Sequence, residues 1–109
     1  RDRRQRQMCI RDRLEETQSL ALTNQVSHRV GFDANDHSLL IERKQSGSYA
    51  ILQKRPVEEE MTLEATRWPS FGPFGFAQSG TILLDSPEFQ TSIVVSSVGR
   101  IRQTDLLKK

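Results

Sequence analysis

The chain has 109 residues, and its 16 basic and 14 acidic side chains give a formal net charge of +2 at pH 7. This length fits one small domain that buries a single hydrophobic core. No run of about 18 apolar residues occurs, so the sequence contains no predicted membrane span.

Residues 1–13 read RDRRQRQMCIRDR and contain six arginines, a composition that by itself favours a nucleic-acid-binding arm. However, Arg3 to Asp12 are also encoded by CGT CGG CAG CGT CAG ATG TGT ATA AGA GAC, followed by AG for the start of Arg13. This DNA resembles the sequencing adapter joined to a transposon end in tagmentation libraries. We therefore predict that residues 1–13 are translated adapter, and we set them aside before considering the fold.

Without residues 1–13 the composition changes, because this segment holds six arginines, two aspartates and the only cysteine, Cys9. The remainder has 10 basic and 12 acidic residues, so its net charge is −2 instead of +2. A mildly acidic domain is not expected to bind polyanions in general. Without cysteine, a disulfide, a thiolate metal site and a cysteine nucleophile are all excluded.

A helix is predicted over residues 14–25, LEETQSLALTNQ, because Leu14, Thr17 and Ala21 recur at helical spacing along one stripe. We assign residues 14–27 to the end of this helix. From residue 28 the apolar period becomes two, which is typical of strands.

Strands are expected over residues 28–33, 38–43, 49–54, 57–65, 81–85, 89–97 and 99–103. Short turns join most of them and no helix intervenes, which favours an antiparallel sheet. The predicted fold class is therefore α+β, with the end of an N-terminal helix followed by an antiparallel β-domain over residues 28–109. The segment 67–80, RWPSFGPFGFAQSG, is predicted to be a long ordered loop that covers one edge of the sheet.

The histidines offer little for catalysis or metal binding. His28 and His37 are the only two, with Asp33 and Asp36 near them in the sequence. Two histidines and an aspartate can bind zinc, but this spacing fits no known ligand pattern. Two solvated surface imidazoles are the favoured interpretation, and we predict neither a metal site nor a cofactor.

Other candidate groups are equally weak. The run Glu58–Glu60 could bind a cation, but consecutive strand residues point to alternating faces, which favours a solvated edge. The serines near the carboxyl end have no histidine nearby in sequence and no nucleophile-elbow motif: Ser92, Ser96 and Ser97. The sequence therefore predicts a protein that is not an enzyme.

The aromatic side chains of the 67–80 segment allow two interpretations. Trp68, Phe71, Phe74 and Phe76 could form a stacking platform for nucleic-acid bases. The alternative is that the rings pack over the sheet, where they bury a large apolar area. We favour packing.

Residues 80–103, GTILLDSPEFQTSIVVSSVGRIRQ, carry the most informative pattern. An aromatic and glycine-containing loop ending near Phe76 precedes Gly80-Thr81-Ile82, the apolar strand Ile93-Val94-Val95-Ser96 follows, and Gly99-Arg100-Ile101-Arg102 ends the pattern. This order resembles the globular domain of the minor pilins and pseudopilins called FimT and GspH.

The resemblance implies a non-enzymatic subunit of a type IV pilus or a type II secretion filament, whose partners are other pilins or pseudopilins. Members of the family are anchored in the inner membrane by an N-terminal apolar helix, which is expected to be missing from this chain. The expected location is the cell envelope, with later assembly into a periplasmic or extracellular filament. A soluble ligand-binding β-domain unrelated to pili is the alternative.

In the FimT-like branch the Gly-Arg-x-Arg motif is associated with DNA capture by competence pili, so the resemblance implies that Arg100 and Arg102 could contact double-stranded DNA during natural transformation. On a strand these two residues share one face, with Cα atoms about 6.6 Å apart, while Ile101 faces the apolar side. Their guanidinium groups could then bind neighbouring phosphates.

The remaining candidates of this motif are two lysines and two glycines. Lys108 and Lys109, on a tail expected to be mobile, could add attraction to DNA, and Gly80 and Gly99 are the structural glycines of the pattern. The alternative is that both arginines have a structural or filament-contact role and pair with acidic groups such as Asp105 or Glu88. The net charge of −2 favours this alternative and predicts weak, salt-sensitive DNA binding.

Overall fold

The computed structural model describes residues 3–104 and 107–108, which form one helix and ten strands. Helix α1 spans Arg3–Asn24. The strands are β1 (His28–Asp33), β2 (Ser38–Gln45), β3 (Ser48–Pro56), β4 (Thr62–Ala65), β5 (Ser70–Phe71), β6 (Ala77–Gln78), β7 (Gly80–Asp85), β8 (Phe89–Val95), β9 (Ile101–Gln103) and β10 (Leu107–Lys108). The predicted α+β class, with one helix followed by antiparallel strands, is confirmed.

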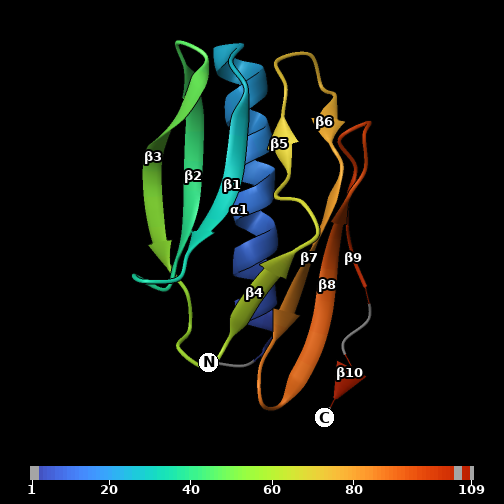
Figure 1. The fold of residues 1–109 in the computed structure, drawn as a ribbon. Coiled ribbons are helices and arrows are strands. Elements are labelled where there is room, and N and C mark those ends of the chain that lie inside the picture. Colours follow the sequence, from blue (N-terminus) through green and yellow to red (C-terminus); the bar gives the residue numbers. More distant parts are fainter. Residues whose placement is uncertain (1–2, 105–106, 109) are drawn as a thin grey trace.

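The strands form two antiparallel sheets, and helix α1 runs behind them along the length of the molecule (Figure 1). One sheet has the order β3-β2-β1-β5-β6, and the other has the order β10-β8-β7-β4 with β9 paired to β8. The sequence predicted a single sheet. The chain changes sheet between β4 and β5, at residues 66–69, where Pro69 has no N–H to donate but its carbonyl accepts a hydrogen bond from the Val30 N–H (3.1 Å).

The predicted helix stripe faces the core. Leu14, Thr17 and Ala21 are each 0% exposed, and the Thr17 hydroxyl donates to the Arg13 carbonyl (2.6 Å), so its burial leaves no unpaired donor. Ile10, 6% exposed, extends the same stripe, and the helix crosses the proposed boundary after residue 13 without a break. Within the described residues, no helix combines the length and the apolar character needed to cross a membrane.

The helix ends at Asn24, one residue before the end of the predicted helix at residue 25 and three before the end of the 14–27 segment assigned to it. Gln25 adopts a left-handed conformation with φ of 55°, and the Val26 N–H bonds back to the Ala21 carbonyl (3.3 Å). This pattern satisfies a free carbonyl of the last turn and turns the chain away from the helix axis. Sequence periodicity does not report such a conformation, so the predicted end was too late.

Alternate strand residues form the rest of the core. In β8, Phe89, Ile93 and Val95 are each 0% exposed, and in β7 Ile82 and Leu84 are likewise fully buried. Burial of each large apolar side chain contributes about 1.5–3 kcal/mol relative to exposure. The outward residues of these strands form the solvent-facing side of the sheet.

The strand predicted over residues 57–65 is shorter in the structure, where β4 begins at Thr62. The Met61 N–H donates to the Glu58 carbonyl (3.0 Å), which closes a turn over Glu58–Glu60. These three side chains are exposed, as predicted, but they lie in a turn and not on a strand edge.

The 67–80 segment is not a simple loop, because β5 and β6 form a short hairpin within it. Phe71 is 1% exposed and packs in the core, whereas Phe74 and Phe76 are 78% and 68% exposed. The prediction that all the rings pack over the sheet is therefore wrong for these two. The loop is held by its backbone, through bonds such as Gly72 N–H to the Phe76 carbonyl (2.8 Å), so its rings are left free to face solvent.

Two glycines lie where the backbone is too crowded for a side chain. At Gly80, a Cβ atom would overlap the carbonyl oxygen of Arg67. At Gly99, where φ is +83°, a Cβ would lie 2.6 Å from the Gly75 carbonyl oxygen and 2.8 Å from Gln18 Nε2. Gln18 Nε2 also donates to the Gly99 carbonyl oxygen (2.6 Å), which ties helix α1 to the turn between β8 and β9.

We expect Gly80→Ala to lower the free energy of unfolding by about 2–3 kcal/mol, because the new methyl group meets rigid backbone and not a flexible side chain. Gly31→Ala is the matched control, since its Cβ would meet only ordinary contacts at 3.4 Å or more. The control should change stability by less than about 1 kcal/mol in urea unfolding. Equal losses in the two variants would contradict the crowding at Gly80.

A second pair of glycines separates backbone strain from crowding. Gly75 and Gly99 both have positive φ, 93° and 83°, but only at Gly99 would an added methyl group meet other atoms within 4 Å. Gly75→Ala should cost about 1–2 kcal/mol from the left-handed conformation alone. Gly99→Ala should cost about 1–3 kcal/mol more, measured as the difference in urea midpoints at constant slope. If Gly75→Ala destabilises the protein as much as Gly99→Ala does, the close contacts at Gly99 contribute nothing measurable to the loss of stability.

Candidate nucleic-acid interface

The turn between β8 and β9 positions the Gly-Arg-Ile-Arg segment. The Gly99 N–H donates to the Ser96 carbonyl (3.0 Å), and the Ser96 N–H donates to the Arg100 carbonyl (3.0 Å). The Arg100 N–H in turn donates to Ser96 Oγ (3.1 Å). Gly99 and Arg100 therefore belong to the turn, and the strand begins at Ile101, two residues later than predicted.

Both arginines of the segment face solvent. Arg102 lies opposite Val94 on β8, and Ile101 lies opposite Val95 and packs against the core. Arg100 and Arg102 are exposed, and within the described residues neither guanidinium group makes a hydrogen bond or ion pair. Glu88, one partner considered from sequence, lies in the turn before β8 at the other end of that strand, and Asp105 lies outside the described residues.

The backbone of Lys108 does not lie beside these arginines. The backbone of Lys108 pairs with Phe89, while Arg102 pairs with Val94 at the other end of β8. Five residues of strand separate these positions by about 17 Å. Residues 107–108 form strand β10, so the prediction of a mobile tail is wrong for Lys108. Lys109 lies outside the described residues.

A third arginine, which the sequence analysis did not single out, lies near the motif. Arg67 is exposed and lines a surface groove of about 320 Å³ with Thr66, Ser79, Gly80, Thr81, Val94 and Val95. Val94 is the cross-strand neighbour of Arg102, so the groove lies directly beside the motif. Arg67 is distant from the motif in sequence, and no local pattern distinguishes it from other exposed arginines.

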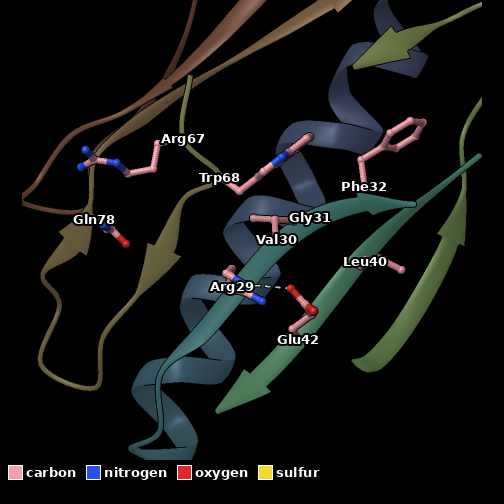
Figure 2. Close-up of a pocket in the computed structure, with 9 residues that line it drawn as sticks. All are labelled: Arg29, Val30, Gly31, Phe32, Leu40, Glu42, Arg67, Trp68 and Gln78. Atoms are coloured by element: carbon pink, nitrogen blue, oxygen red, sulfur yellow. Dashed lines mark hydrogen bonds and ion pairs between the residues drawn. The ribbon is translucent and has the colours of Figure 1, made fainter. Parts of the chain in front are cut away.

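A second groove, of about 470 Å³, runs along β1 and is shown in Figure 2. Arg29 and Glu42 lie on one side of it, joined by a hydrogen bond of 2.8 Å from Arg29 Nε to Glu42 Oε1. That bond raises the pKa of Arg29 above its ordinary value, and the guanidinium group stacks on the Tyr49 ring at 4.1 Å. Arg67 lines this groove as well, so it connects the two surfaces.

Charge is distributed unevenly along the long axis of the molecule. Arg29, Arg43 and Lys44 lie on β1 and β2 beside the end of helix α1, because His28 pairs with Arg43 and the Lys44 N–H donates to the Ser27 carbonyl (2.9 Å). Arg67 lines both grooves, Arg100 lies in the turn before β9 and Arg102 lies on β9. We refer to these six basic residues as the basic end. Most of the acidic residues of the described chain lie at the opposite ends of β1 and β7, which we call the acidic end, together with Lys54 and Arg55: Asp33, Asp36, Glu58, Glu59, Glu60, Asp85 and Glu88. An acidic domain can therefore still present a locally positive surface.

At the acidic end the charges pair locally. Lys54 Nζ lies 2.5 Å from Asp36 Oδ2 and 3.5 Å from Asp33 Oδ2. Hydrogen bonds from the backbone N–H groups of Asp36 and Asn35 lower the pKa of the Asp33 carboxyl. The hydrogen bond to Asp36 raises the pKa of Lys54. These interactions occupy Lys54, whereas the two arginines of the Gly-Arg-Ile-Arg segment have no such partners among the described residues.

The histidines lie at opposite ends of β1 and do not form a site together. His28 is 0% exposed, and its ring Nδ1 donates to the Val26 carbonyl (2.8 Å), so the prediction of a solvated imidazole is wrong for this residue. Its position on β1 has the same parity as the buried Val30, which directs it into the core. His37 bonds the Glu58 carbonyl (2.8 Å) and contacts Phe32 edge-on.

In the part of the chain that the structure describes, no group of three or more histidine, cysteine, aspartate or glutamate side chains is arranged to hold a metal ion. The candidate serines have structural partners. Ser92 Oγ lies 3.0 Å from Thr104 Oγ1, and Ser96 bonds the turn as described above. The exposed groups that remain as candidates for binding a partner are arginine side chains and the rings of Phe74 and Phe76.

Comparison by sequence finds no matching family model and no matching curated protein. Comparison of structures does find similar chains. The structure is similar to the minor pseudopilin EpsH from the type 2 secretion system of Vibrio cholerae, with a TM-score of 0.73 and 13% identity over 89% of this chain and 91% of EpsH.

It is also similar to the type IV minor pilin FimU of Pseudomonas aeruginosa in two crystal forms. The TM-scores are 0.76 and 0.75, each with 16% identity over 94% of this chain, and the matches cover 87% and 92% of FimU. At identities this low, the TM-scores establish a shared fold. The chain has the fold of the minor pilins and pseudopilins of the FimT/GspH type.

Proposed function

We propose that this chain is the globular domain of a minor pilin or pseudopilin, a non-enzymatic subunit of a type IV pilus or type II secretion filament. The observation that supports the proposal most directly is the fold, which is shared over nearly the full length of one minor pseudopilin and one minor pilin. The order of the aromatic loop, the β7 and β8 strands and the Gly-Arg-Ile-Arg segment supports it independently from the sequence.

In this proposal the partners are other pilins or pseudopilins, and the location is the cell envelope. An apolar helical segment that precedes Leu14 in the native protein would anchor the subunit in the membrane before assembly and pack inside the filament afterwards. The β-domain would then present its sheets and turns to neighbouring subunits or cargo. The end of the domain at which α1 terminates lies farthest from such an anchor (Figure 1).

We further propose that the basic end of the domain contacts DNA. Arg100 and Arg102 face solvent without partners among the described residues, and Arg67 lies on the groove beside them. Guanidinium groups bind phosphate oxygens in a bidentate manner. Contacts to the phosphate backbone carry little sequence information, so any double-stranded DNA should bind, with an affinity that decreases steeply with salt.

A soluble ligand-binding domain remains the alternative from a different class. It would require a site that encloses a small molecule. The two grooves that involve Arg67 are open to solvent and are lined by polar and charged side chains as well as apolar ones. These grooves fit an extended polyanion better than a buried small ligand.

The filament proposal makes a prediction about the native gene. Upstream of the codon for Leu14, we expect a coding sequence for an apolar helix of about 20 residues, preceded by a short leader, in place of the adapter-like codons. Sequencing the locus from the source DNA tests this. A gene that encodes RDRRQRQMCIRDR at this place would contradict both the adapter origin of residues 1–13 and the anchor.

The DNA proposal predicts that double-stranded DNA is retarded in a gel-shift titration and that Arg100→Ala combined with Arg102→Ala weakens binding at least tenfold, because each arginine loses charge-assisted hydrogen bonds. The slope of log affinity against log salt, measured between about 50 and 200 mM, should decrease by about two. Arg67→Ala should have a smaller effect in the same direction.

The matched control is Arg55→Ala, an exposed arginine at the acidic end that bonds the Gln53 side chain. All proteins carry glutamine at Arg3, Arg4 and Arg6, so that these three arginines add no background, and any background from Arg1, Arg11 and Arg13 is the same in every variant. If Arg55→Ala weakens DNA binding as much as the double variant does, the DNA is attracted nonspecifically to any exposed cation of the protein. The DNA proposal then fails.

A further inference from the structure

The basic end of the domain also displays an aromatic surface. Phe74, Phe76 and Val98 are 78%, 68% and 67% exposed, the largest exposed fractions among the large apolar side chains of the described residues. We refer to these three residues as the aromatic tip. They come from two segments distant in sequence, the loop between β5 and β6 and the turn between β8 and β9. Clustered exposed apolar side chains mark interaction sites more often than isolated ones.

The backbone, and not the rings, holds these two segments together. The Ala77 N–H donates to the Ser97 carbonyl (2.9 Å), and Gly99 approaches the Gly75 carbonyl too closely for a side chain. Gln25 Nε2 donates to the Pro73 carbonyl (3.1 Å), which fixes the loop to the end of helix α1. The exposed phenylalanines are thus presented on an ordered support, and the fold does not need their side chains for packing.

The aromatic tip is continuous along the backbone with the cationic groups. Val98 immediately precedes Gly99 and Arg100, and on the other segment the residues after Phe76 lead into the groove at Ser79. That groove ends at Arg67 and adjoins Arg102 through Val94. Two acidic residues of the described chain lie near these cations: the Glu42 carboxylate is paired with Arg29, and exposed Glu64 lines a hollow that shares Thr66 and Thr81 with the Arg67 groove.

This combination distinguishes between classes of partner. An apolar protein surface would contact the phenylalanine rings but would leave the arginines without a charged partner. Duplex DNA would bind the arginines through its phosphates but would leave the rings unused, because its bases are stacked inside the helix. A single strand offers both phosphates and unpaired bases. Proteins that bind single strands without sequence preference combine a basic groove with aromatic side chains on which bases stack.

We propose that the aromatic tip stacks on unpaired bases, so that this surface binds single-stranded DNA in preference to duplex DNA. The inference rests on the proposed DNA contact and adds the form of DNA that is bound. Arg100, Arg102 and Arg67 hold the phosphates, while Phe74 and Phe76 contact the faces of successive bases. Because every base has a π-face, little sequence preference is expected.

The test is fluorescence anisotropy of the full chain, with glutamine at Arg3, Arg4 and Arg6, against three labelled probes: oligothymidylate of about 16 nucleotides, an abasic sugar-phosphate oligomer of the same length and a duplex of the same length. The protein should bind oligothymidylate about tenfold or more tighter than the abasic oligomer. Phe74→Leu with Phe76→Leu should abolish that difference while leaving the affinity for the abasic oligomer unchanged.

Two further variants separate stacking from simple apolar contact. Phe74→Trp with Phe76→Trp should retain or increase the preference for oligothymidylate, since tryptophan stacks at least as well as phenylalanine. Ile51→Ala removes an apolar side chain that is 53% exposed on β3 and should have no effect. Thermal melting checks that each variant is folded.

The outcomes distinguish the inference from the proposed function. If the abasic oligomer binds as tightly as oligothymidylate, or the leucine variant keeps the preference, base stacking is refuted. Loss of binding in Arg100→Ala with Arg102→Ala would still support the phosphate contact in that case. If no probe binds at low salt, both the DNA contact and the base contact are refuted.

Discussion

The hydrogen bond from Gln18 Nε2 to the Gly99 carbonyl oxygen joins the C-terminal half of helix α1 to the turn that holds Arg100 and leads into Arg102 on β9. It requires a residue without a side chain at position 99, because φ there is +83° and the Gly75 carbonyl lies close by. One glycine thus sets the end of β8, the start of β9 and the approach of the β5–β6 loop. The exposed residues of both segments take their positions from this contact.

Net charge alone gives a misleading picture of this surface. Residues 14–109 are mildly acidic, yet the fold groups arginines around the two grooves and the turn before β9, and most carboxylates at the opposite ends of β1 and β7. Within about a Debye length of 8–10 Å, a DNA phosphate at the basic end interacts mainly with nearby arginines and is screened from distant carboxylates. The physical consequence is a weak but localised attraction between this surface and a phosphate group.

Backbone contacts also explain why Phe74 and Phe76 are exposed, as they explain the need for glycine at position 99. A loop anchored through its own backbone does not need every ring in the core, and Phe71 and Ala77 pack the hairpin against it. The neighbouring aromatic side chains are then available for a ligand. His28 differs from the phenylalanines in the opposite sense. The sequence predicted it to be a surface residue, but its position on β1 directs the side chain into the core.

The sequence by itself determined the fold class, the helix stripe of Leu14, Thr17 and Ala21 and most of the strands, since these follow from periodicity over short stretches. It also indicated the pilin-like order of the elements from Gly80 to Arg102. Only the tertiary structure decided that there are two sheets, that Phe74 and Phe76 face solvent, and that Arg67 lies beside the Gly-Arg-Ile-Arg segment. Each of these depends on pairing between segments distant in the chain, such as β1 with β5 and Thr66 with Thr81, and local pattern carries no record of such pairing.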